Sequence, residues 1–226
     1  KTQESFINPH KKTLLSDYQE TRQDFSTAVS GILSTATDDK ISTLAQKIKT
    51  LEQNQADLFN TMVETVDVMD QKRNELKSRL GEMNSVLEEI IVSIDQKETE
   101  LMMEGESLDT TQIGARREIK GFLNYGTERL LNIVTLLFFA DADAYHKTKE
   151  TLEKKRELAV NNLDTMIKAT GTDTYTQGWQ KVKDYLVDID QMEASVLSGW
   201  KQNQDLMTEL QKNAAAIQEK AFSIVD

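Results

Sequence analysis

The chain has 226 residues, of which 29% are charged, and a formal net charge of −11. This acidity argues against nucleic acid as a partner, because phosphate binding needs a basic surface, and it equally disfavours docking on anionic lipid. There is no cysteine, so disulfides and thiolate metal sites are excluded. No apolar run approaches the roughly 20 residues that a membrane-spanning helix requires. The chain begins at Lys1 without an initiator Met, and we expect it to be part of a longer protein.

The first half of the chain predicts two helices. Asn8-Pro9 is a start signal, and apolar residues at steps of three and four from Leu15 to Ile32 form one helix face. The segment Thr37-Asp38-Asp39 is expected to end this helix and cap the next. The second helix should run for about 60 residues to a turn at 105–109. Strand signals are nearly absent and the chain has one proline, so the predicted class is all-α.

Three more helices are predicted in the second half. One starts near Thr110 and loosens at 140–143, where Asp143 is expected to cap the following helix. That helix should end at Gly171-Thr172-Asp173, and the last should run to the end of the chain. The regular spacing of apolar residues indicates left-handed packing similar to that of coiled coils.

The apolar pattern of the first half repeats in the second half at an offset of 134 residues, the separation between Arg22 and Arg156. Other residues that coincide are Tyr18 with Leu152, Ile48 with Val182, Leu76 with Leu210 and Ile90 with Ile224. A repeat of this length indicates a duplicated helical module. We therefore expect two stacked antiparallel four-helix bundles that share long helices and arose by internal duplication.

The duplication predicts how one domain over 1–226 divides into two modules. One would comprise approximately 10–66 plus 144–200, and the other approximately 67–140 plus 201–226. The first helix of the second half, at 110–140, has no counterpart in the first half. We expect that counterpart to lie largely before Lys1.

Two arginines occupy equivalent positions in apolar seams. Arg22 lies 16 residues before Asp38, and Arg156 lies 16 residues before Thr172. An unpaired guanidinium in a core is costly, and its planar fork suits a carboxylate. We predict a binding site formed by Tyr18, Arg22, Asn54, Gln55, Arg156 and Tyr185. The alternative is that Asp188 or Glu20 neutralises the arginines, or that their stems reach the surface.

A second, weaker candidate site involves polar residues that interrupt the seams further along the helices. Arg73 and Asn203 are two such residues, and Arg129 with Asn124 and Tyr125 lies on the helix from Thr110. The candidate residues are Arg73, Asn124, Arg129 and Asn203. Polar residues in such seams also serve simply to fix helix register.

No enzyme activity, metal or cofactor is expected. Neither His10 nor His146 has a nearby nucleophile in sequence, and the chain has no glycine-rich phosphate loop or HExxH motif. The apolar run 133–140 could be a membrane-inserting tongue of a toxin, but it is too short to span a membrane as a helix. We expect it to pack in the core.

This helix pattern, over essentially the whole chain, resembles the helical bimodular sensor domain of bacterial methyl-accepting chemotaxis receptors. The resemblance implies a periplasmic domain of an inner-membrane protein, flanked by transmembrane helices outside this chain. It implies a small organic acid as ligand, a homodimer, and a signal passed inward by displacement of the last helix. It makes 10–66 plus 144–200 the membrane-distal module and 67–140 plus 201–226 the membrane-proximal one.

Two alternatives remain open. The same type of domain occurs in sensor histidine kinases, where it could respond to a binding-protein partner. A structural or toxin-like helical rod would need no small ligand.

Overall fold

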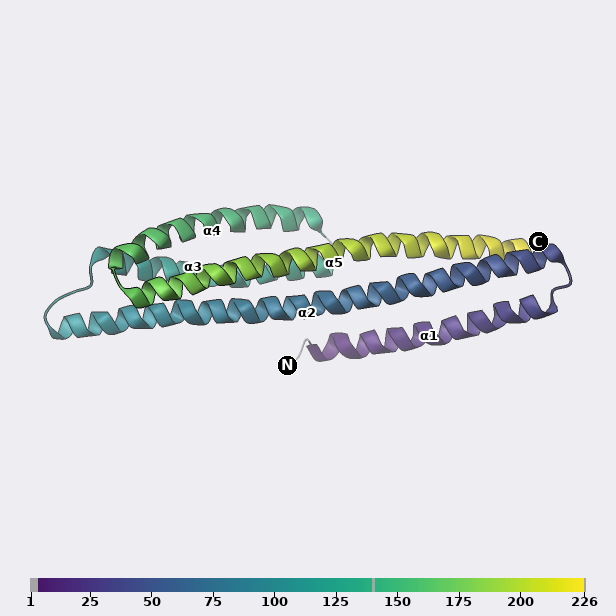
Figure 1. The fold of residues 1–226 in the computed structure, drawn as a ribbon, viewed down its shortest axis with the longest axis horizontal. Helices are drawn as coiled ribbons and strands as arrows, with labels where there is room; N and C mark the ends of the chain where they lie inside the picture. Colours follow the sequence, from purple (N-terminus) through teal and green to yellow (C-terminus); the bar gives the residue numbers. More distant parts are fainter. Residues whose placement is uncertain (1–3, 140, 226) are drawn as a thin grey trace. The chain divides into compact units, whose positions relative to one another are not determined.

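The structure is a computed structural model that describes residues 4–139 and 141–225, and in it these residues form helices joined by short connections. The five helices are α1 (Glu4–Thr35), α2 (Asp39–Met103), α3 (Thr110–Phe139), α4 (Ala142–Thr170) and α5 (Asp173–Val225) (Figure 1). The described residues contain no strand, so the all-α prediction is confirmed. Ala140, in the predicted break at 140–143, lies outside the described residues.

Aspartate side chains cap two of the helices. Oδ1 of Asp38 accepts hydrogen bonds from the backbone N–H groups of Lys40 at 2.6 Å and Ile41 at 3.3 Å, which confirms the predicted cap of α2. The cap of α4 is Asp141, which accepts from Ala144 N–H at 2.9 Å. The prediction of Asp143 as this cap is wrong, because Asp143 already lies inside the first turn.

Other helix ends follow from backbone conformation. Gly105 and Gly171 follow α2 and α4 with φ angles of 77° and 64°, a left-handed conformation that glycine adopts without a Cβ penalty. At the other end of the chain, α1 begins at Glu4 rather than at the predicted Asn8-Pro9. Pro9 therefore lies within the helix.

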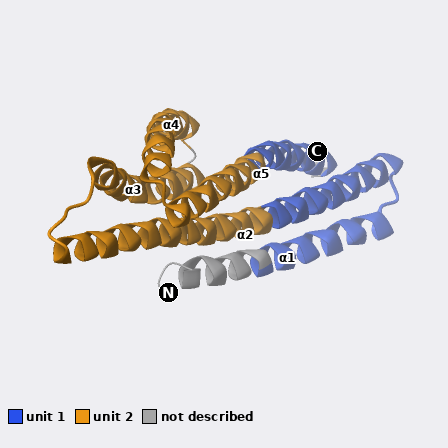
Figure 2. Cartoon of the chain, turned by 60° about the vertical axis from the view of Figure 1, so that its left-hand side comes forward, with its two compact units in different colours: residues 1–65, 201–226 blue, residues 66–200 orange. Residues whose placement is uncertain are grey.

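The chain divides into two compact units (Figure 2). Unit 1 comprises 1–65 and 201–226, and unit 2 comprises 66–200. Within unit 1, Arg22 of α1 contacts Glu52 of α2. Asn213 of α5 donates to the backbone oxygen of Leu51 in α2 at 2.7 Å. Unit 1 is thus built from α1, the first part of α2 and the last part of α5.

Unit 2 contains the second part of α2, α3, α4 and the first part of α5. Arg116 near the start of α3 pairs with Asp95 at 2.7 Å, whereas Gly126 further along α3 lies against Leu80. Residues later in α3 therefore contact residues earlier in α2, so the two segments are antiparallel.

The other neighbouring helices of unit 2 are also antiparallel. Lys155 of α4 pairs with Glu128 of α3 at 3.1 Å, and Asn162 donates to Glu118 at 3.4 Å, so α4 is antiparallel to α3. Trp179 of α5 donates to Asp164 at 2.6 Å and Arg156 to Asp190 at 2.8 Å, so α5 is antiparallel to α4. The largest fully buried side chains of unit 2 are Leu76, Met83, Leu87, Ile94, Ile119, Ile133, Leu136, Tyr145, Leu163, Ile167, Leu186 and Ile189.

The structure groups the segments differently from the sequence prediction. The prediction joined 10–66 to 144–200 and 67–140 to 201–226, whereas 66–200 form a single unit. It assumed that the first parts of the two long helices pack together. Instead, Gly178 near the start of α5 lies against Ile90 in the second half of α2, where an added Cβ would be 3.1 Å from Cδ1 of Ile90. Because α5 runs antiparallel to α2 there, the start of one packs against the end of the other.

Candidate functional site

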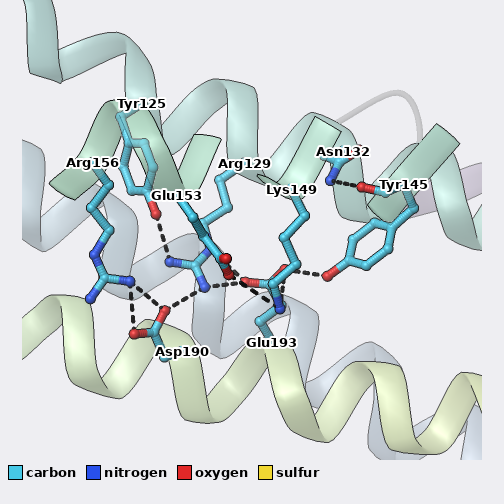
Figure 3. Close-up of polar contacts among 9 residues, drawn as sticks. All are labelled: Tyr125, Arg129, Asn132, Tyr145, Lys149, Glu153, Arg156, Asp190 and Glu193. Carbon is cyan, nitrogen blue, oxygen red and sulfur yellow. Dashed lines mark hydrogen bonds and ion pairs between the residues drawn. The ribbon is translucent and has the colours of Figure 1, made fainter. Parts of the chain in front are cut away.

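A cluster of charged and polar side chains lies inside unit 2, where α3, α4 and α5 face one another (Figure 3). At its centre Arg129 of α3 and Glu193 of α5 are buried, with side chains 6% and 2% exposed. Arg129 is carried inward because it lies on the buried face of α3, three and four residues from Gly126, Tyr125 and Ile133. Glu193 lies in the same way on the buried face of α5.

The guanidinium of Arg129 uses all three nitrogens within the cluster. Nε donates to Oε2 of Glu193 at 2.6 Å, and Nη2 donates to Glu193 and, at 2.6 Å, to Oδ1 of Asp190. Nη1 donates to the phenol oxygen of Tyr125 at 2.8 Å. Burial alone would lower the pKa of Arg129, but Tyr125 and the two carboxylates outweigh it and raise the pKa. Arg129 is therefore held charged and in a fixed orientation.

Glu193 has further partners on its other side. The hydroxyl of Tyr145 donates to Oε1 of Glu193, and Nζ of Lys149 lies 3.7 Å from the same oxygen. Burial, reinforced by the bond to Glu193, raises the pKa of Tyr145, so its phenol stays protonated as a donor. Asn132 fixes this part of the chain by donating to the backbone oxygen of Tyr145 at 3.1 Å.

Asp190 links the buried centre to a more exposed arginine. Its Oδ1 also accepts from Nη1 of Arg156 at 2.8 Å, and its Oδ2 accepts from the same nitrogen at 2.8 Å. Burial would raise the pKa of Asp190, but the hydrogen bonds from Arg156 and Arg129 lower it. The side chains of Arg156 and Asp190 are 23% and 43% exposed, so dissolved molecules can reach this ion pair.

A groove of about 490 Å³ opens beside this pair. Its lining residues are Arg129, Lys149, Glu153, Arg156, Glu157, Val160, Asn161 and Asp190. The volume lies within the range of about 300–1,000 Å³ that is usual for small-ligand sites. The arrangement can therefore offer a small polar molecule both guanidinium donors and carboxylate acceptors.

The structure regroups the predicted arginines. Arg22 and Arg156, predicted in one site, lie in different units, and each pairs with a carboxylate of its own unit. Nε of Arg22 donates to Oε1 of Glu52 at 2.6 Å. Conversely, Arg129 and Arg156 were predicted for different sites and share Asp190. The predicted alternative of internal neutralisation matches these contacts in kind, but the acids are Glu52 and Asp190 rather than Glu20 and Asp188.

The remaining residues predicted to accompany Arg22 and Arg156 are not among those that line the groove. Tyr18 stacks on Phe59 in unit 1, with ring centroids 3.7 Å apart. Asn54 is exposed, and Gln55 buries its Oε1 without a hydrogen bond to the residues that the structure describes. Tyr185, in unit 2, lies beneath the guanidinium of Arg79 at 5.4 Å.

The residues of the weaker predicted site divide between the two units. Arg73 pairs with Asp70 on its own helix at 3.3 Å. Asn124 is exposed on α3, and Asn203 belongs to unit 1, whereas Arg129 belongs to unit 2. Of the four residues, Arg129 is the one that lines the groove.

Sequence reasoning missed the acidic half of the site. Glu193 continues the spacing of Leu186 and Ile189 and precedes Val196 by three residues, so it occupies a seam position in α5. A carboxylate at such a position signals a buried cationic partner. Asp190, one residue beyond the seam, carried no comparable signal.

Comparison with known proteins leaves the site without a relative to guide its interpretation. No family model, no curated protein and no solved structure matches the chain.

In the described part of the chain, no helix combines the length and apolar character needed to cross a bilayer. Nor do the described residues include a group of three or more His, Cys, Asp or Glu side chains suited to a metal. The chemistry of the groove therefore rests on its own residues.

Proposed function

We propose that the chain is the ligand-binding sensor domain of a bacterial transmembrane receptor, of the helical bimodular type found in chemotaxis receptors. Two features support this architecture: α2 and α5 each contribute to both units, and unit 2 contains four antiparallel segments. In the proposal the two units are helical modules related by duplication. The domain is periplasmic, homodimeric and non-catalytic, and it is flanked by transmembrane helices.

The proposed ligand is a small carboxylate bound in the groove of unit 2. The observation that carries this proposal is the position of Arg156, which lines the groove and is partly exposed beside the buried Arg129–Glu193 pair. A guanidinium in such a place can bind a carboxylate through charge-assisted hydrogen bonds. All three nitrogens of Arg129 already donate to protein groups, so its role in the proposal is to position Asp190.

In the proposal the signal is a change in how two helices of the groove, α4 and α5, pack against each other. Arg156 lies on α4, and its present partner Asp190 lies on α5. A ligand that takes over Arg156 loosens this link, so it favours a packing of α4 and α5 that differs from the unliganded one. Because α5 extends into unit 1, a small displacement of this helix is a physical route for the signal.

A structural rod is the second candidate, and one observation favours it. Arg22, Arg129 and Arg156 are all paired with carboxylates of the chain itself. Buried ion pairs of this kind can serve only to fix helix register. A rod of this kind would need no small ligand.

A thermal-shift screen with acetate, succinate, malate, citrate and amino acids separates the two candidates. A ligand present at 100 times its dissociation constant stabilises the folded state by about 2.7 kcal/mol. The sensor proposal expects at least one such shift in the wild type, its loss in Arg156→Gln, and its retention in Arg117→Gln, which removes an exposed arginine of α3. No shift with any compound favours the rod.

A further inference from the structure

The walls of the groove carry both signs of charge in equal number. The cations are Arg129, Lys149 and Arg156, and the carboxylates are Glu153, Glu157 and Asp190. Glu193 behind them is a further carboxylate, already bonded to Arg129. An anionic ligand that enters the groove therefore meets no net positive charge, and a dicarboxylate would add two negative charges next to four carboxylates.

Asp190 engages only one nitrogen of the Arg156 guanidinium group. Both oxygens of Asp190 accept from one nitrogen, Nη1, at 2.8 Å (Figure 3). A bidentate carboxylate pair normally engages two nitrogens of the guanidinium. A ligand carboxylate that engages two nitrogens can therefore replace Asp190 at Arg156.

The carboxylate that the ligand displaces needs a new partner. Oδ1 of Asp190 keeps its bond to Nη2 of Arg129 at 2.6 Å, but Oδ2 would lose the hydrogen bond that it accepts from Arg156. A partly buried carboxylate oxygen without a donor is costly. Glu157 of α4 lines the same groove and creates the same demand for a cation, whereas Glu153 there already lies 3.7 Å from Nζ of Lys149.

From these contacts we infer that the groove binds a zwitterion, a small molecule with both a carboxylate and an ammonium group, such as a free amino acid. The ligand carboxylate pairs with Arg156, and its ammonium group pairs with the acidic side formed by Asp190 and Glu157. One internal ion pair is thereby exchanged for two ligand pairs without a change in net charge. Val160, half-buried in the lining, contacts the hydrocarbon part. The inference rests on the proposed sensor function and specifies its ligand class.

The test is isothermal titration calorimetry with the common amino acids and 4-aminobutyrate. Each compound that binds is compared with its analogues that lack one charged group: propionate and ethylamine for alanine, butyrate and propylamine for 4-aminobutyrate. We expect removal of either charge to weaken binding at least tenfold. The variant Glu157→Gln should weaken binding of the zwitterion by a similar factor, because it removes one of the two carboxylates assigned to the ammonium group. The control Glu64→Gln, which removes an exposed carboxylate of unit 1, should leave this affinity unchanged.

The contrary outcomes separate this inference from the proposed function. The zwitterion inference is wrong if acetate, succinate, malate or citrate binds and no amino acid does. It is also wrong if the analogue without the ammonium group binds as tightly as its parent. In both cases the proposed carboxylate sensor stands. If no probe of either kind binds, or if the amines bind as tightly as the zwitterions, both proposals fall.

Discussion

Arg129 and Glu193 each remove the cost of burying the other. Both side chains are almost wholly inaccessible, and together with Tyr125, Tyr145 and Asp190 they satisfy one another's hydrogen-bonding groups. In such a pair the desolvation of two ions offsets much of their attraction, so the pair as a whole adds little net stability. Loss of one partner is a different matter, because the other remains charged in a poorly hydrated place.

Replacement of Arg129 by Met should therefore destabilise the protein by about 3–5 kcal/mol, because buried Glu193 loses its nearest cation and retains Lys149 at 3.7 Å and the hydroxyl of Tyr145. The free energy of unfolding, measured by urea titration, checks this. The double variant Arg129→Met/Glu193→Leu should be more stable than the single variant, since it removes both charges. A double variant that is less stable than Arg129→Met would contradict the account.

The phenol of Tyr145 gives a prediction at alkaline pH. Tyr145→Phe should cost about 1.5–3 kcal/mol at pH 7, the usual contribution of a hydrogen bond to a charged group. The folded-state pKa of Tyr145 is raised by burial and by Glu193, so the stabilisation is complete below the unfolded-state pKa of about 10. It is lost as the pH rises above that value. The difference in unfolding free energy between wild type and Tyr145→Phe should thus narrow above about pH 10, and a constant difference would contradict the assignment.

At the scale of helices, apolar spacing and turn residues carried most of the prediction. Steps of three and four located the helices, and Asp38, Gly105 and Gly171 marked ends that the structure confirms. What spacing could not supply was the choice of packing partner. An apolar seam looks the same whichever seam it faces, so the repeat of Arg22 at Arg156 did not reveal that the two residues belong to different units.

The cap of α4 provides a matched test of one boundary. Asp141→Ala should destabilise the protein by about 0.5–2 kcal/mol, because the N–H of Ala144 loses its side-chain acceptor. Asp143→Ala removes the same charge from the first turn but no cap, and should cost less. Thermal or urea unfolding of the two variants compares them directly, and a larger loss in Asp143→Ala would show that the cap is assigned to the wrong aspartate.

At the scale of the whole molecule, two long helices connect units of different chemical character. α2 has 65 residues and α5 has 53, and each contributes one part to unit 1 and the other to unit 2. In unit 1 the pair Arg22–Glu52 is flanked by the stacked rings of Tyr18 and Phe59. In unit 2 the charged cluster borders a groove of ligand size.

The candidate site was only partly predictable from the sequence, because its arginines stand out among apolar residues more clearly than its carboxylates do. Arg156 was predicted as a cation in an apolar seam and Arg129 as a member of the weaker polar site, and both line the groove. Their convergence depends on Asp190 and on the antiparallel order of α3, α4 and α5, neither of which a seam pattern encodes. Glu193 could have been found as a carboxylate at a seam position, and it would have indicated the buried pair with Arg129.

The most direct test of the central claim is hydrogen–deuterium exchange of the domain with and without saturating compound from the thermal-shift screen. The account expects slower exchange in the segments that carry the groove, residues 149–161 of α4 and 186–197 of α5, and no such protection in Arg156→Gln. Protection confined to residues 18–22 and 52–59 of unit 1 would place the ligand at Arg22 and contradict the account. Unchanged exchange throughout, with every compound of the screen at millimolar concentration, would contradict the sensor function itself.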